Sequence, residues 1–343
     1  MSIFTALIER EPPDNALRFD GRAGHVESYF FRANDPSRPR AFWLKQTILA
    51  PLDGPALAES WFIWFDAERG RTIAHRVSQP YSQAIFTGFG DPSKHLETRA
   101  ITVELAPNGS ARGELEPPEG RVSFDVRWSP LASPIAEPLS IFPCKLLRTG
   151  PFPRSKLLSP LPALAFSGAI ELPDERVEFE RWPGMQGHNW GKEHTFEYAW
   201  GQCLFADDDA MVEGFTGRVR VAGRASPRVS AMVVRRGART YRFDTIFDTW
   251  RQRAEVELDR WALTLRSRDG EATLVMNAAD RPMVCLGYDN PNGEPSYCFN
   301  SKLAEVELTV RPSDGAQFVC KSPHGGALEF LRRQRDPRFE RVV

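Results

Sequence analysis

The segment Arg121-Val122-Ser123-Phe124-Asp125-Val126-Arg127-Trp128 decides the fold class, because every second side chain in it is apolar and the others are polar. A β-strand points successive side chains to opposite faces, so this alternation predicts a strand with one buried face and one face in water. The same period recurs around Val177 and Phe179, and again around Val256 and Leu258. The sequence therefore predicts a protein built of β-strands.

Turn signals lie between these alternating runs. Asn108-Gly109 and Asp269-Gly270 favour the positive backbone angles of tight hairpin turns, which predicts antiparallel neighbours. Proline is abundant, with 28 of 343 residues, and so widely spread that few windows could hold a long helix. We expect an all-β protein made of meandering antiparallel strands.

The length of 343 residues suits two domains, because compact domains usually hold about 100 to 200 residues. The segment 148–162 contains four prolines and no clean alternation, which predicts a connection between two β-rich parts. We therefore predict domains at residues 1–165 and 166–343. Each has enough strands for a barrel or a strongly bent sandwich of about eight strands, which encloses room for one small ligand.

The charge balance is close to zero, with 44 Lys plus Arg against 45 Asp plus Glu, and it gives no support to a nucleic-acid or anionic-membrane partner. No apolar stretch approaches the roughly 20 residues of a membrane-spanning helix, and the first residues lack the basic start of a secretory signal. We expect a soluble cytoplasmic protein. The five cysteines are scattered, which predicts reduced thiols and no zinc site.

The segment Gly187-His188-Asn189-Trp190-Gly191 begins the densest group of proton-transferring and aromatic side chains in the chain. Imidazole exchanges its proton readily near neutral pH, so His188 is a candidate acid or base. Trp190 would share its face on a strand, and an indole can stabilise a developing cation. Gly187 and Gly191 would allow close backbone approach or a bulge.

Further candidates follow on the next predicted strands. Tyr198, Trp200 and Gln202 share one face, and Glu213 has apolar neighbours that would bury its carboxyl group and keep it protonated. The same residue types also serve as ordinary core, and the pattern alone leaves the two interpretations open. His188 and His194 lack a third ligand at a recognisable spacing, so we predict no metal site.

Other aromatic and polar residues are weaker candidates. Trp43, Trp61 and Trp64 lie in runs that are apolar on both faces, which favours core packing for most of them, while one or two could line a ligand cavity. We take Trp64 as a substrate-binding candidate. Asn300 lies on a predicted strand, where it could bind backbone or a ligand. The sequence has no nucleophile elbow, phosphate loop or dinucleotide motif, and we expect no cofactor.

The segment from Gly184 to Gly191, with Trp200-Gly201-Gln202-Cys203 and Cys298-Phe299-Asn300-Ser301, resembles the tocopherol cyclase family. It also resembles the lipocalin-like relatives of that family, the carotenoid 1,2-hydratases (hydroxyneurosporene synthases) and the fungal lipocalin-like Diels-Alderases. The Gly-His-Asn-Trp-Gly block is the most specific part, and the first half matches mainly in strand order and aromatic content. The resemblance implies two lipocalin-like (calycin) β-domains in tandem, with a lipophilic pocket at or near their junction.

The resemblance also implies a chemistry. In the hydratases the His-x-Trp pair is implicated in protonating an alkene and steadying the carbocation, which implies catalytic roles for His188 and Trp190. Glu213 is a rough match to their acidic residue. We therefore expect a cofactor-free cyclase or hydratase for an isoprenoid or polyketide-like molecule. The alternative is a non-catalytic carrier of a hydrophobic molecule. The expected substrate-binding residues are Asn189, Tyr198, Trp200, Gln202, Trp64 and Asn300.

Overall fold

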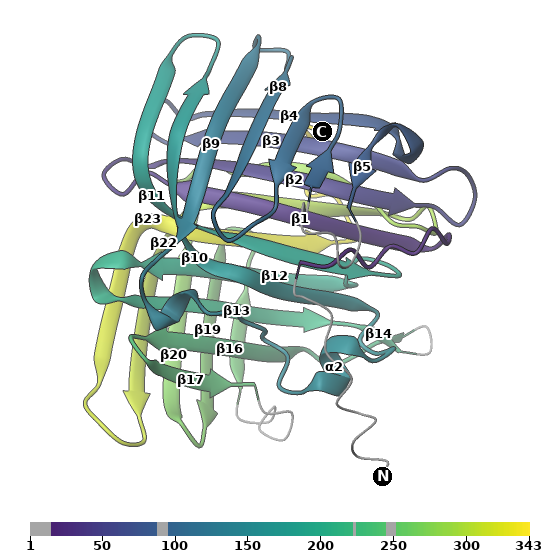
Figure 1. Cartoon of the computed structure of the whole chain (residues 1–343). Helices are drawn as coiled ribbons and strands as arrows, with labels where there is room; N and C mark the ends of the chain where they lie inside the picture. Colours follow the sequence, from purple (N-terminus) through teal and green to yellow (C-terminus); the bar gives the residue numbers. More distant parts are fainter. Residues whose placement is uncertain (1–14, 88–94, 222–223, 245–251) are drawn as a thin grey trace, which may run out of the picture.

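The computed structural model describes residues 15–87, 95–221, 224–244 and 252–343. Nearly all the regular structure in these residues is β-strand, arranged in two large antiparallel sheets (Figure 1). The helices of the described chain are short, and none has the length and apolar character needed to cross a membrane. They are η1 (Tyr81–Gln83), η2 (Pro134–Ala136), α2 (Lys145–Thr149) and η3 (Ala206–Asp208). The all-β prediction is confirmed.

Eleven strands of the described chain form the first sheet, in the order β4-β3-β2-β1-β11-β10-β9-β8-β7-β6-β5. Their bounds are β1 (His25–Asn34), β2 (Arg40–Ala50), β3 (Leu57–Asp66), β4 (Arg71–Pro80), β5 (Ile85–Phe86), β6 (His95–Glu97), β7 (Ile101–Glu104), β8 (Gly109–Leu115), β9 (Val122–Pro130), β10 (Ser155–Glu171) and β11 (Arg176–Gly191). The segment that predicted the fold class forms β9. β7 and β8 form the hairpin predicted near Asn108-Gly109, but its loop spans residues 105–108 and neither Asn108 nor Gly109 has the expected positive φ.

The second sheet has the order β17-β16-β13-β12-β23-β22-β20-β19-β18, and β21 pairs with β22 beside this path. The bounds are β12 (Glu197–Phe205), β13 (Ala210–Arg218), β16 (Val229–Arg236), β17 (Arg239–Phe243), β18 (Arg253–Val256), β19 (Arg260–Ser267), β20 (Gly270–Asn277), β21 (Val284–Asp289), β22 (Pro295–Pro312) and β23 (Phe318–Arg332). A short pair, β14 (Arg220–Val221) with β15 (Arg224–Ala225), stands apart. The hairpin predicted at Asp269-Gly270 joins β19 to β20.

Each sheet bends around its own apolar core, so that strands distant in the sheet order come into contact. In the first sheet the ring of Phe62 on β3 stacks on that of Phe124 on β9, with 5.6 Å between centroids. In the second sheet the indole Nε1 of Trp261 on β19 donates to Thr216 Oγ1 on β13 at 3.1 Å. The fold is therefore two lipocalin-like antiparallel units in tandem.

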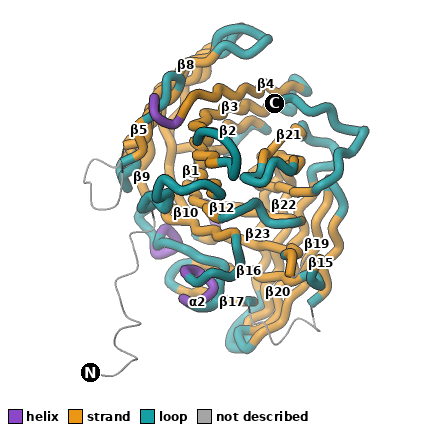
Figure 2. Tube along the Cα trace, turned by 90° about the vertical axis from the view of Figure 1, so that its right-hand side faces the viewer, coloured by secondary structure: helices purple, strands orange, loops and turns teal. Residues whose placement is uncertain are grey.

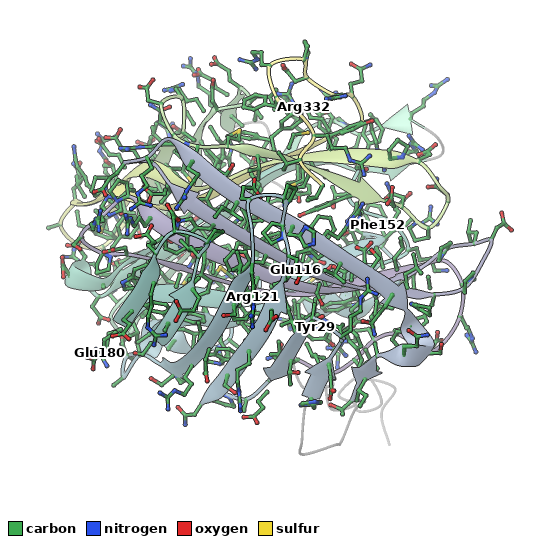
Figure 3. All side chains as sticks on the ribbon, turned by 90° about the horizontal axis from the view of Figure 1, so that it is seen from above. Tyr29, Glu116, Arg121, Phe152, Glu180 and Arg332 are labelled. Atoms are coloured by element: carbon green, nitrogen blue, oxygen red, sulfur yellow. The ribbon has the colours of Figure 1, made fainter. Side chains whose placement is uncertain are left out.

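In the view from above, Tyr29 lies among the strands and Glu180 lies at the edge of the molecule (Figure 3).

The chain leaves the first sheet after β11 and enters the second at β12, so the change of sheet lies at residues 192–196. The predicted boundary after residue 165 falls inside β10, which pairs with β9 and β11 in the first sheet. The expectation that all of 148–162 is a connection is wrong, because β10 begins at Ser155. Pro160 and Pro162 fall at shifts in the pairing register of β10, where a strand tolerates proline. The division into domains stays a prediction.

The two sheets lie against each other (Figure 2). A third apolar cluster, with residues from both sheets, fills the contact between them. Phe30 on β1 meets Trp200 on β12 edge to face, with ring centroids 5.9 Å apart, and Trp61 on β3 meets Tyr288 on β21 in the same manner at 5.8 Å. The indoles of the first half are thus buried, as expected of core residues. This cluster forms one wall of the candidate site.

Candidate functional site

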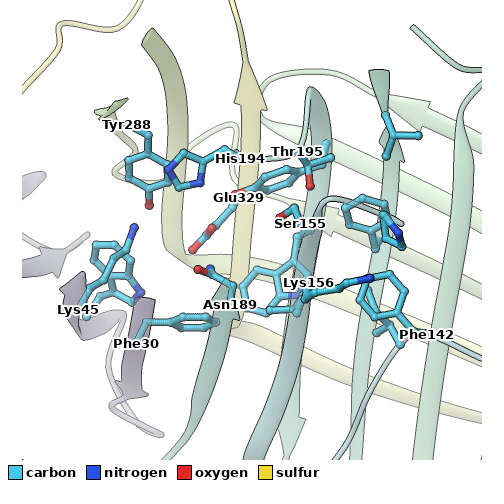
Figure 4. Close-up of a pocket in the computed structure, with 18 residues that line it drawn as sticks. Phe30, Lys45, Phe142, Ser155, Lys156, Asn189, His194, Thr195, Tyr288 and Glu329 are labelled. Carbon is cyan, nitrogen blue, oxygen red and sulfur yellow. The ribbon is translucent and has the colours of Figure 1, made fainter. Parts of the chain in front are cut away.

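A pocket lies where the two sheets meet (Figure 4). Its free space measures about 870 Å³, including the part that opens to solvent. Aromatic rings dominate the walls, and a few polar groups face inward among them. The lining includes Phe30, Trp43, Lys45, Leu157, Asn189, His194, Tyr198, Trp200, Phe215, Tyr288 and Glu329. This set, called here the junction pocket, draws on both sheets and on the connection between them.

Strand alternation decides which residues of β11 reach the junction pocket. Asn189 lines it, so His188 and Trp190, its chain neighbours, point to the other face of the sheet. In the strand pairing His188 lies opposite Tyr29, a core residue of the first sheet. The prediction that His188 and Trp190 face the junction pocket is therefore wrong. Both lie on the inner side of the first sheet.

His188 belongs to a buried hydrogen-bond network around Glu27. Its Nε2 lies 2.9 Å from Glu27 Oε1, and its ring stacks on Tyr29 with 4.2 Å between centroids. The carboxyl of Glu27 also accepts from Tyr29 Oη at 2.8 Å and lies 2.9 Å from His25 Nε2. Burial raises the pKa of Glu27, but the bonds from His188 and His25 overcome that effect and lower the pKa to about 2. Glu27 is thus an anion, and both imidazoles donate to it.

Trp190 completes this inner group without reaching the junction pocket. Its ring lies 4.8 Å from that of His188, and the guanidinium of Arg18 stands 4.8 Å above its centroid. The predicted adjacency of imidazole and indole is present. Their surroundings are the interior of the first sheet and the segment that precedes β1.

Glu213 lies behind the pocket wall, where it holds an aromatic residue of that wall in place. Its Oε1 accepts from Trp200 Nε1 at 3.0 Å, and its Oε2 accepts from Ser159 Oγ at 2.7 Å. Burial raises the pKa of Glu213, as the sequence predicts. Because Trp200 lines the junction pocket and Glu213 does not, Glu213 orients the indole.

Three predicted substrate-binding residues lie outside the lining of the junction pocket. Gln202 bonds with Arg32 and donates to the carbonyl of Pro162 at 3.1 Å. Trp64 belongs to the core of the first sheet. Asn300 donates from Nδ2 to Glu329 Oε1 at 3.0 Å, so it positions a residue that does line the pocket. The expectation of direct contact was wrong for these three, since core and inter-sheet packing use them instead.

The pocket contains Asn189, Tyr198 and Trp200, as the sequence predicts, and also His194, which the predicted site omits. Burial lowers the pKa of His194 to about 3, and the charges of Lys45 and Arg333 add to the effect. Its imidazole is therefore neutral at pH 7. Its backbone amide donates to Asn290 Oδ1 at 2.9 Å, which fixes the connection between the sheets.

Two phenols and a carboxyl group lie near His194. The ring of Tyr288 is 5.1 Å from the imidazole, and burial raises the pKa of both Tyr288 and Tyr198 far above that of an ordinary tyrosine. Both phenols therefore keep their protons. Glu329 Oε1 is 2.5 Å from Lys302 Nζ, which neutralises its charge. These groups give the junction pocket a proton acceptor and two proton donors within apolar walls.

Lys45 is the other residue that the predicted site omits. It is 3% exposed, and its Nζ lies 3.8 Å from the ring centroid of Tyr288 and 5.3 Å from that of Trp61. Burial lowers its pKa to about 8. The sequence does carry a signal for it, because Lys45 follows Trp43 by two residues and so shares its face on a strand. Nothing periodic marks His194, which lies between strands.

No group of three or more His, Cys, Asp or Glu side chains within the described part of the chain is arranged to hold a metal ion. Four of the five cysteines are buried, as expected, and Cys144 is exposed.

No model of a known protein family matches the sequence. Uncharacterized proteins from two strains of Mycobacterium tuberculosis are 22% identical over 317 residues, which cover 89% of this chain and 87% of theirs. A crystal structure from Nitrosomonas europaea, provisionally assigned as AttH, matches 95% of this chain and 96% of its own, with a TM-score of 0.55 and 14% identity. Kievitone hydratase from Nectria haematococca matches with a TM-score of 0.51 and 10% identity, covering 96% of this chain and 94% of that one. These likenesses show a shared fold.

Proposed function

We propose that the protein is a cofactor-free hydratase or cyclase that acts on a lipophilic unsaturated molecule in the junction pocket. The observation that carries the proposal is the neutral imidazole of His194 in an apolar pocket beside Tyr288. The fold shared with kievitone hydratase agrees with this class of reaction. Shielding from water strengthens each polar interaction with the substrate and protects reactive intermediates.

The reaction adds an oxygen to one carbon of a double bond and a proton to the other. In a hydratase the oxygen comes from water, and in a cyclase it comes from a hydroxyl of the substrate. In both, the attacking oxygen loses a proton. We assign the acceptance of that proton to His194, whose neutral imidazole lines the pocket. Because burial keeps its pKa low, the imidazole holds this proton only until a phenolate takes it.

The proton that the second carbon gains must come from a group that holds one at neutral pH. Tyr198 and Tyr288 meet this requirement. A phenol is too weak an acid to protonate an isolated alkene, but it suits an enolate, which forms when an oxygen adds to a double bond conjugated to a carbonyl. The pocket therefore favours a conjugated substrate over the isolated alkene that the resemblance implies. Proton exchange between imidazolium and phenolate then restores the enzyme.

A carrier without catalysis is the second candidate. It is favoured by the position of His188 and Trp190, which the resemblance associates with catalysis and which face away from the pocket. In a carrier, Asn189 and His194 would only orient the ligand. The two candidates therefore differ in whether His194 affects turnover or binding alone.

The experiment uses a chalcone with a hydroxyl ortho to its carbonyl, a lipophilic enone whose hydroxyl adds across its own double bond. We expect the protein to accelerate ring closure, and His194→Gln to lose at least about 90% of the rate, within the usual range for a missing acid–base group. His95→Gln, a histidine on β6 that pairs with Glu97, is the matched control and should keep the rate. Compounds extracted from the purified protein are identified by mass spectrometry in parallel. Unmodified lipid in the extract and no acceleration of the chalcone would support the carrier and overturn the enzyme.

A further inference from the structure

Lys45 places a buried ammonium group in the junction pocket with no anionic partner. Among the described residues, none forms a hydrogen bond or an ion pair with its Nζ, and three aromatic rings surround it, those of Tyr288, Trp61 and Trp43. The close-up shows the amino group of Lys45 beside the ring of Tyr288, among the residues that line the pocket (Figure 4). Lys156, the other lysine of the lining, is already bound, since it donates to the carbonyl of Leu147 at 2.7 Å.

The nearby acids are engaged elsewhere. Glu329 Oε1 is held by Lys302 and Asn300, at 2.5 Å and 3.0 Å. Glu59 Oε1 lies 3.6 Å from Arg76 and accepts from Ser78 Oγ at 3.3 Å. Neither carboxylate comes within ion-pair distance of Lys45. The titratable and charged groups that act on Lys45 from the packed strands and the connection are Glu59, Arg76, His194, Tyr288, Cys298 and Glu329.

A buried ammonium without an anion is costly, because it has given up its hydration. The faces of aromatic rings compensate for only part of that loss. The fold therefore retains at this point a positive charge that a ligand can neutralise. An uncharged apolar ligand would not offset the free-energy cost of the hydration that the Lys45 ammonium has lost.

We propose that the junction pocket recognises its ligand through an ionised oxygen, such as a carboxylate, phenolate or enolate, which pairs with Lys45. The apolar part of the ligand then packs on Phe30, Trp43 and Trp200. The inference deepens the proposed function, on which it rests for the use of the same pocket. In the proposed addition the carbonyl oxygen becomes an enolate, so the same ammonium would also stabilise the charge that develops there.

Two fluorescent probes that differ in one charged group test the proposal. Anilinonaphthalenesulfonate is an anion, and N-phenylnaphthylamine is the same ring system without the sulfonate. We expect the protein to bind the anion at least about tenfold more tightly than the neutral probe, as a charge-assisted contact allows. Lys45→Met should remove most of that preference and change the affinity for the neutral probe by less than about twofold. Lys321→Met, which removes an exposed positive charge, should change neither.

The pH dependence gives a second measurement, with Lys45→Met as its control, because burial lowers the pKa of Lys156 in the same pocket to about 8 as well. Free Lys45 loses its proton as the pH rises through about 8, so affinity for the anionic probe should be full below that pH and fall above it. The neutral probe should show no such fall. An anionic probe whose affinity stays level from pH 7 to pH 10 would contradict the role of Lys45.

A variant that fills the pocket separates failure of this inference from failure of the proposed function. Leu157→Trp places an indole in the lining and, once its thermal unfolding shows a folded protein, should block both probes. If both are blocked but Lys45→Met binds the anion as tightly as the wild type, the inference is overturned and the pocket stands. If neither is blocked, the pocket is not the ligand site, and both proposals fail.

Discussion

His188 on β11 and Glu27 on β1 form a hydrogen bond of 2.9 Å between Nε2 and Oε1, with both side chains fully buried on the inner side of the first sheet. The same carboxylate accepts from the backbone amides of Arg18 and Phe19 at 3.0 Å and 2.8 Å. The pair thus fastens the segment before β1 to two adjacent strands. We infer that the conspicuous histidine of the Gly-His-Asn-Trp-Gly block serves the stability of the first sheet.

Glu27→Gln should lower the free energy of unfolding at pH 7 by about 3 kcal/mol. This value follows because the Glu27 carboxyl has a pKa of about 2 in the folded protein and 4.5 in the unfolded chain. Because the folded pKa is the lower one, this stability is present above pH 4.5 and is lost as the pH falls from 4.5 toward 2. Urea unfolding at pH 7 and at pH 3 measures it. The wild type should lose more stability between these pH values than the variant, and equal losses would contradict the account.

His188→Ala should lower the free energy of unfolding by about 2 to 3 kcal/mol, because it leaves the buried carboxylate of Glu27 short of a donor. Binding of the neutral probe to the junction pocket should change by less than about twofold, since His188 faces the other side of the sheet. Chemical denaturation and probe titration measure the two effects. If His188→Ala had unchanged stability and no longer bound the probe, the result would contradict the structural role and show that His188 belongs to the ligand site.

The hydrogen bond between Glu213 and Trp200 can be tested with a severe and a mild substitution of Glu213. Glu213→Ala should destabilise the protein by about 1 to 3 kcal/mol, because it leaves the buried indole N–H and the Ser159 hydroxyl without an acceptor. It should also weaken probe binding, since Trp200 is then free to shift. Glu213→Gln keeps an acceptor for the indole and should recover most of the binding. Near-normal binding in Glu213→Ala would show that the indole is held by packing alone.

The strands could be predicted from the sequence because alternation is local: the run from Val122 to Trp128 needs only its own period of two to identify β9. The boundary between the sheets could not be predicted from the sequence in this way. Pro160 and Pro162 suggested a connection, yet they lie at irregular points of a 17-residue strand whose neighbours on both sides supply the pairing. The sequence period carries no information about such long-range pairing.

The candidate site was predictable only in part, for a related reason. Strand alternation shows that His188 and Asn189 face opposite sides of the sheet, but it does not show which side meets the second sheet. That choice depends on the packing of β1 and β11 against β12. Tyr198 and Trp200 were identified because aromatic residues on one face of a strand suit a pocket wall. His194 was omitted because it lies in a connection, where no period applies.

Gly187 connects the Gly-His-Asn-Trp-Gly block to the junction pocket through its contact with Phe30. It pairs with Phe30 across β1 and β11, and a Cβ added to it would come within 2.1 Å of the Phe30 ring, which lines the pocket. Gly187→Ala should therefore destabilise the protein by about 1 to 3 kcal/mol and alter probe affinity, because the ring must move. Phe30→Leu removes the obstacle. In that background Gly187→Ala should cost at least about 1 kcal/mol less, as chemical denaturation of the four proteins of the cycle would measure. Additive costs would mean that the glycine is required by the backbone and not by Phe30.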